Sequence, residues 1–317
     1  MHDQRLRKRA GLLAVMIFAA TAARAQPLVH LVTPGAPRDI VVTAPRAPTE
    51  QEVRRQGRMI TRGGDFYHEP LARFEDPVCP GISGLPVAVA SLMVDRIRYD
   101  AERVGAPLDK SADCKANIVV AFVRNGATAV RELLKTKSFL FAGLETAEAN
   151  EIDAEAGPVR AWNTTVVRTR FGEPESPRLQ QGPVKMSGSV SLGPVPVTIV
   201  PSSDSHIYVA SRLDIASSVI VIDLAAIDGM SVDQIADYAA MRALARTRPA
   251  RVGSPAATIL SLFDPTGPSP AQMTTFDLAY LRSLYNAASN VPAVVKIGGI
   301  SRAWRRDEDR LREARRQ

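Results

Sequence analysis

The 317-residue chain has few side chains suited to acid–base, nucleophilic or metal chemistry. It contains two cysteines and four histidines, and no two histidines have the spacing of a metal-binding pair on one helix. The zinc-binding pattern HExxH is absent, and so is a glycine-rich phosphate-binding loop that opens a helix. We therefore expect no cofactor and no metal site.

One run of residues could support nucleophilic catalysis, because Asp204, Ser205 and His206 are consecutive. Serine hydrolases bring these three residue types together so that the histidine can take the serine proton. Neighbouring residues of a strand point to opposite faces, however, so this run cannot form the relay by itself. Two interpretations stay open: a hydrolase site of unrecognised type in this region, or a polar loop with a surface histidine.

The first 25 residues have the three parts of an export signal in the correct order. Basic residues around Arg5 and Arg9 precede a 13-residue apolar run, and Ala23-Arg24-Ala25 predicts cleavage between Ala25 and Gln26. The apolar run is shorter than the roughly 20 residues that span a bilayer. We expect a periplasmic or secreted protein whose mature chain has no transmembrane segment.

The charge distribution argues against nucleic-acid binding, although the formal net charge of the whole chain is +7. Residues 1–25 hold five basic residues and one acidic residue, so the mature chain carries only +3. The remaining surplus lies in residues 26–64 and 302–317, which leaves −3 on residues 65–301. Nucleic-acid binding needs a basic face on the folded unit. The seven arginines of the tail, with Trp304, offer a different hypothesis, a contact with an anionic surface.

The two cysteines, Cys79 and Cys114, suit an oxidising compartment, where an even pair favours a disulfide over a metal site. We expect this bond to tie the start of the folded body to its sheet. Two free buried thiols are the alternative.

Residues 26–78 are rich in proline and arginine and predict a linker. Within it, Ile40, Val41 and Val42 belong to a short β-branched run that resembles the TonB box of outer-membrane receptors, a segment captured by strand addition. An ordinary extended linker explains the same run.

Hydrophobic patterns predict one α+β or α/β domain over residues 79–301, with a mixed sheet and flanking helices. Helices are expected over 86–104, 125–135, 231–246 and 274–288, a short acidic helix or loop over 144–156, and a charged C-terminal helix over 302–317. Strands are expected over 117–123, 159–170, 195–200, 206–210 and 218–224. Ser231 and Gln234 form a capping box, and we expect Asp223 to cap a helix rather than act as an acid.

Residues 219–285 resemble the C-terminal half of zincin-like, metalloprotease-related exported bacterial proteins of unknown function. The resemblance rests on the order VIVID, QIADYAAMRALA, TILSLF and FDLAYLRSLY. The HExxH positions of the active pattern fall on Asp237, Tyr238 and Met241, so both metal ligands and the general base are replaced. The resemblance implies a zincin-like fold without zinc chemistry, that is, a pseudoenzyme.

Two functional classes follow. The first is an exported, non-enzymatic envelope protein that binds a protein or peptide partner. The resemblance implies that the strand with Val219, Val221 and Asp223 is an exposed edge able to take an extended peptide. The second is a hydrolase whose site includes Asp204, Ser205 and His206.

Overall fold

The computed structural model describes residues 46–111, 113–174, 179–180, 197–198, 207–250, 253–266, 269–314 and 316. Three features of the sequence lie outside these ranges and stay predictions. They are the export signal with its cleavage site Ala25–Gln26, the segment Ile40, Val41 and Val42, and the run Asp204, Ser205 and His206.

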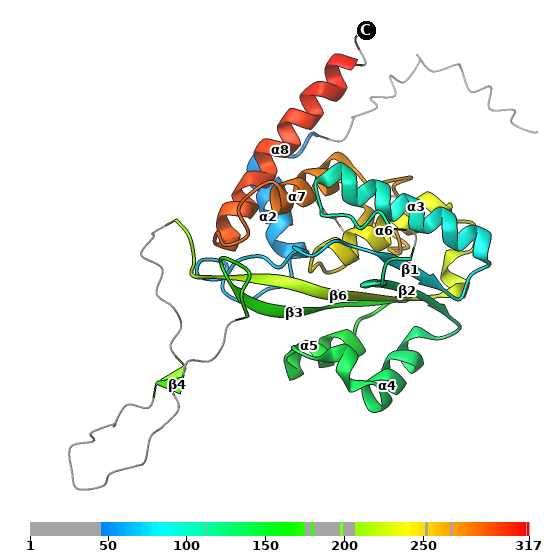
Figure 1. Cartoon of the computed structure of the whole chain (residues 1–317). Helices are drawn as coiled ribbons and strands as arrows, with labels where there is room; N and C mark the ends of the chain where they lie inside the picture. Colours follow the sequence, from blue (N-terminus) through cyan, green and yellow to red (C-terminus); the bar gives the residue numbers. More distant parts are fainter. Residues whose placement is uncertain are drawn as a thin grey trace, which may run out of the picture. The chain divides into compact units, whose positions relative to one another are not determined.

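The described chain contains both helices and strands (Figure 1). In chain order they are α2 (Glu50–Ile60), β1 (Pro80–Ser83), α3 (Val87–Val104), β2 (Ile118–Val123), α4 (Gly126–Thr136), η1 (Ser138–Phe141), α5 (Thr146–Asp153), β3 (Val159–Thr169), β4 (Leu179–Gln180), β5 (Val197–Thr198), β6 (Ser211–Asp223), η2 (Leu224–Ile227), α6 (Val232–Leu244), η3 (Ile259–Ser261), α7 (Thr275–Tyr285) and α8 (Ala293–Ala314).

A four-stranded sheet organises the domain, with the strand order β1-β2-β6-β3 (Figure 1). β1, β2 and β6 run parallel, whereas β3 is antiparallel to β6. The interior strand β2 and residues 219–222 of the interior strand β6 have continuous apolar sequences, because a strand covered by helices on both faces needs apolar side chains in both directions. The structure confirms a single α+β domain with one mixed sheet and flanking helices.

Helices cover both faces of this sheet (Figure 1). α4 and α5 lie on one face, where Phe141 stacks on Trp162 of β3 with ring centroids 4.5 Å apart. α2, α3, α6 and α7 lie on the other face, over a larger core that includes Met93, Ile220 and Met241. Each fully buried side chain of this size stabilises the fold by about 1.5–3 kcal/mol. The larger core therefore supplies most of the hydrophobic stabilisation.

Local signals set several helix boundaries. α3 ends at Gly105, whose φ of 83° lies in the left-handed region that glycine adopts without strain. α6 begins with the expected capping box, in which Ser231 and Gln234 each accept a hydrogen bond from the other's backbone N–H. Asn125 is the N-cap of α4, and Asp223 accepts a further hydrogen bond from the N–H of Gly126, the first residue of this helix. Asp223 also directly precedes η2, where its side chain makes no capping hydrogen bond.

The predicted linker is wrong for its second half, because the compact unit begins at Ala47. α2 contributes Val53 and Ile60 to the larger core, and the segment after it contributes Phe74. The buried positions of α2 recur with helical spacing, but the arginines on its outer side make the segment look polar. The folded domain is therefore longer than residues 79–301.

The expected exposed edge strand is also wrong. β6 lies between β2 and β3 and bonds to both, so Val219 and Val221 are paired on two sides. Asp223 pairs with β2, and its N–H donates to the carbonyl of Pro158. Val221 is 1% exposed. The strand also begins earlier than expected, at Ser211, and residues 207–210 form a bend rather than a separate strand. Its apolar run reflects an interior position, and the edges of the sheet belong to β1 and β3.

The C-terminal helix α8 begins at Ala293, well before the charged tail, and packs against α2 and α7. A Cβ atom on Gly57 of α2 would lie 2.6 Å from Cδ1 of Ile300, so the two helices approach closely. Trp304 is buried in the core, which rules out its insertion into an anionic surface. Within the described ranges, no helix has the length and apolar character needed to cross a membrane.

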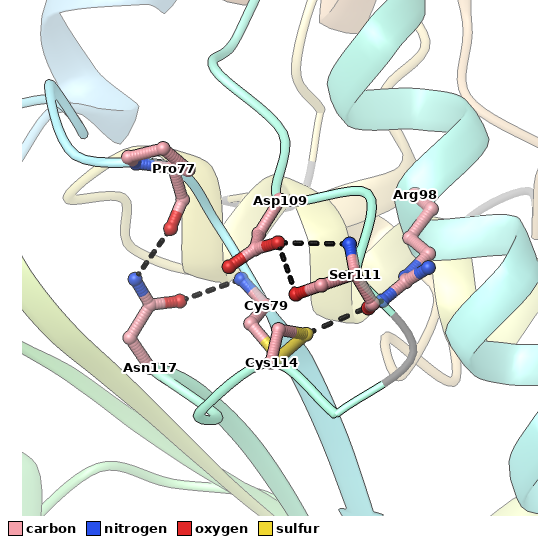
Figure 2. The surroundings of a disulfide bond; sticks show 7 residues. All are labelled: Pro77, Cys79, Arg98, Asp109, Ser111, Cys114 and Asn117. Atoms are coloured by element: carbon pink, nitrogen blue, oxygen red, sulfur yellow. Dashed lines mark hydrogen bonds between the residues drawn. A yellow bond between two sulfur atoms is a disulfide. The ribbon is translucent and has the colours of Figure 1, made fainter.

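The structure contains the expected disulfide between Cys79 and Cys114, with Cα atoms 6.0 Å apart (Figure 2). Cys79 directly precedes β1, and Cys114 lies shortly before β2. Asn117 links the same two segments. Its Oδ1 accepts a hydrogen bond from the N–H of Cys79, and its Nδ2 donates one to the carbonyl of Pro77 (Figure 2). The bond therefore fastens the start of β1 to the start of β2.

Candidate functional site

β3 is an edge strand whose outer side has no partner strand in the described part of the chain. In an antiparallel pair, every second residue bonds to the neighbouring strand and the residues between them point their backbone groups outwards. The N–H of Thr169 donates to the carbonyl of Glu173, outside the ladder with β6. Because inward and outward residues alternate along the strand, Val167 and Thr165 also point their backbone groups outwards. No described residue accepts a hydrogen bond from the N–H of Thr165 or Val167.

Three arginine–glutamate pairs close over the first half of the same edge. The arginines belong to α6 and the segment after it, and the glutamates belong to α5 and the segment after it. These elements cover opposite faces of the sheet, so the pairs join the two helical layers around β3 (Figure 1). The N···O distances are 2.8 Å for Arg242–Glu155, 2.6 Å for Arg246–Glu148 and 2.7 Å for Arg248–Glu151.

Arg62 lies at the centre of these pairs, with its side chain only 5% exposed. Its Nη atoms are 3.6–3.9 Å from carboxylate oxygens of Glu148, Glu151 and Glu155. Nη1 donates to the carbonyl of Ala161 on the outer side of β3, whereas Nε has no hydrogen-bond partner in the described structure. Burial lowers the pKa of Arg62, and the glutamates oppose that shift. Charged side chains thus cover the edge near Ala161.

A cleft of about 520 Å³ continues from this cluster along the open part of the edge, and both Thr165 and Val167 line it. Gly143 lies against the edge here, since a Cβ at this position would be 2.9 Å from the carbonyl oxygen of Thr165. The lining has both signs of charge. It includes Arg62, Arg212, Arg246, Arg248, Glu69, Glu145, Glu148 and Glu151.

The residues at the HExxH positions of the resemblance do not form a catalytic group. Asp237 is fully buried and accepts two hydrogen bonds from Arg96, at 2.6 and 2.9 Å. The hydroxyl of Tyr238 accepts from Arg242 at 2.9 Å, and burial raises the pKa of this tyrosine. Met241 is 0% exposed and packs in the core. The three side chains therefore serve three separate structural contacts.

A second buried carboxyl group, Asp100, lies beside Asp237 and was not expected from the sequence. Asp100 is 0% exposed, and neither of its oxygens has a hydrogen-bond partner among the described residues. Burial raises its pKa to about 8, and the charge of Asp237 adds to the shift. The available sequence signal was a carboxylate on the apolar face of α3, three residues after Ile97.

Within the ranges that the structure describes, no three histidine, cysteine, aspartate or glutamate side chains are placed to hold a metal ion. Comparison with models of protein families found no match, and comparisons with curated proteins and with solved structures found none. The site must therefore be interpreted from its own geometry.

The arginine–glutamate cluster was not expected from the sequence, although a signal for it is present there. Glu148, Glu151 and Glu155 are spaced three and four residues apart, and Arg242 and Arg246 are spaced four apart. Such spacing places each set on one helical face. Their meeting across the edge of β3 depends on the tertiary fold, which no local pattern reveals.

Proposed function

We propose that this chain is an exported envelope protein that binds an extended segment of a protein partner along the open edge of β3. The observation that carries the proposal is the pair of outward-facing residues, Thr165 and Val167, on the wall of a 520 Å³ cleft. An extended peptide can add a strand to such an edge, because main-chain hydrogen bonds supply affinity and alternate side chains enter the neighbouring space. β3 thus replaces the strand that the sequence had suggested.

The charges of the cleft favour a partner segment with basic side chains. Its arginines are already engaged, because Arg246 and Arg248 pair with glutamates and Arg212 lies 3.0 Å from Asp214. Glu69 and Glu145 also line the cleft, and neither has an arginine, lysine or histidine partner within the described chain. Two carboxylates without an ion-pair partner beside a strand edge suit an extended segment with lysine or arginine at alternate positions.

Export is part of the proposal. The disulfide supports an oxidising compartment, the periplasm or the exterior, and residues 1–25 have the sequence of a signal peptide. The zincin-like relationship rests on the order of motifs over residues 219–285 and on the replaced HExxH. The hydrolase alternative centres on His206, which lies outside the described residues, and no structural observation favours it.

Peptide selection tests the proposal directly. Peptides selected from a random phage-displayed library on the folded protein would be fluorescently labelled and titrated by anisotropy. Val167→Pro removes the outward N–H at a position where an edge strand tolerates proline, and Val167→Ala removes the side chain but keeps the N–H. We expect Val167→Pro to weaken binding about tenfold, the effect of one lost hydrogen bond with added steric conflict. Val167→Ala should weaken it much less.

Peptide variants keep the test valid if Val167→Pro alters folding. N-methylation at every second peptide residue should abolish binding to the wild-type protein, while methylation of the intervening residues should have little effect. Uniform tolerance of N-methylation would contradict strand addition. A library that yields no binder, or equal affinity for the proline and alanine variants, would contradict it as well.

A further inference from the structure

A second cavity, of about 540 Å³, lies between α7 and α8, away from the edge of β3. Five cationic side chains line it, and no acidic side chain does. They are Arg282, Lys296, Arg302, Arg305 and Arg306.

Most of this positive charge has no protein counter-charge. Arg282 pairs with Asp307 at 2.6 Å, and Arg305 pairs with Glu50. Arg302, Arg306 and Lys296 have no carboxylate within 4.0 Å in the described part of the chain, although many other arginines of this domain do. Three of the five basic side chains thus have no ion-pair partner in the described part of the chain.

Arg302 and Arg306 lie one turn apart on α8, where two like charges repel and destabilise the helix slightly. Lys296 is only 2% exposed, and its Nζ donates to the carbonyl of Leu284 at 3.1 Å. Burial lowers the pKa of Lys296 to about 7, with a further contribution from Arg73. Arg302 and Arg306 thus repel each other on the exposed side of α8, and a bound anion would relieve this repulsion.

Part of the cavity lining is apolar and is formed by Ala287, Val295 and Ala303. Arginine side chains offer planar pairs of donors that match the oxygens of phosphate and carboxylate. A phosphomonoester carries about 1.5–2 negative charges at neutral pH, so it balances these cations better than a single carboxylate does.

We propose that the cavity between α7 and α8 binds a phosphate group, held chiefly by Arg302 and Arg306. The phosphate can belong to a soluble ion or to a lipid headgroup, since both present the same oxygens. The apolar part of the lining would contact the remainder of a larger ligand.

Calorimetric titration of the full chain with inorganic phosphate at low ionic strength tests this assignment. The pocket variant is Arg302→Ala with Arg306→Ala. The matched control is Arg312→Ala with Arg316→Ala, which removes the same charge from exposed positions that do not line the cavity. We expect at least tenfold weaker binding by the pocket variant and less than twofold weaker binding by the control.

Vesicle co-sedimentation separates the two sources of phosphate. Vesicles of phosphatidylcholine, with or without phosphatidic acid, would be compared for the same three proteins. Sedimentation that requires phosphatidic acid and is lost only in the pocket variant assigns a lipid headgroup. Phosphate binding without sedimentation assigns a soluble ligand. Equal losses in the pocket variant and the control, or a wild-type protein that binds neither probe, would overturn the proposal.

Discussion

Replacing Asp100 with asparagine should stabilise this protein at neutral pH. Asp100 is fully buried beside Asp237, and Asp237 takes the hydrogen bonds of Arg96. The nearest arginine atoms to Asp100 itself are 3.9 Å away. Ionised Asp100 would therefore be a buried charge with weak compensation, and an amide has the same shape without the charge.

The raised pKa of Asp100 gives the size of the effect. The group titrates at about 8 in the folded protein and at 3.8 as a free side chain. Between these values the unfolded chain loses its proton while the folded chain keeps it, so stability falls as pH rises, by roughly 1.4 kcal/mol per pH unit. At pH 7 the accumulated loss is on the order of 4 kcal/mol. Asp100→Asn removes this loss and leaves stability near pH 4 almost unchanged.

Urea unfolding at a series of pH values between 4 and 8 measures the effect, with circular dichroism as the signal. Asp95→Asn is the matched control, because Asp95 lies exposed on the same helix and has no ion pair within the described residues. The expected result is a flatter dependence of unfolding free energy on pH for Asp100→Asn alone. If Asp100→Asn lowers stability at pH 7, or if its pH dependence matches that of the wild type, the reasoning about Asp100 is refuted.

Three further perturbations test other parts of the fold by the same unfolding measurement. Removing the disulfide with Cys79→Ala and Cys114→Ala should cost about 3–4 kcal/mol, since the bond closes a loop of 35 residues; a loss below about 1 kcal/mol would contradict this. Arg242→Met should cost roughly 3–5 kcal/mol because it leaves Glu155 buried without its partner, and adding Glu155→Gln should restore part of that loss. The pKa of Lys296 is lowered from 10.5 to about 7 in the folded protein. The free energy of unfolding of the wild type should therefore increase as the pH rises from 7 to 10.5, by about 1.4 kcal/mol per pH unit. Lys296→Met should abolish this increase.

The elements that the sequence predicted well are those with a strong local pattern. The helix over residues 86–104 has an apolar face and a glycine after its last turn, and α3 matches it closely. The capping box at Ser231 placed the start of α6 correctly. Each of these signals acts within a few residues, so no knowledge of the tertiary fold is needed.

The errors came from features that depend on distant parts of the chain. The sequence did not predict α2, because its buried face is short and its outer face is rich in arginine. Its packing partner α8 also lies far away along the sequence. The run VIVI of β6 is compatible with either an edge or an interior strand until its neighbours are known. The cleft beside β3 is likewise formed by segments that converge only in the fold, including residues 62–70, 143–151 and 246–248.

The packing of α2 on α8 has a consequence for the order in which the protein can fold. Gly57 contacts Ile300, and Glu50 pairs with Arg305, so α2 completes its contacts only after α8 has been synthesised. Contacts between residues so far apart in sequence form slowly, because the ends of a long intervening chain must first be brought together. The elements between α2 and α8 must therefore be synthesised before this contact can close the domain.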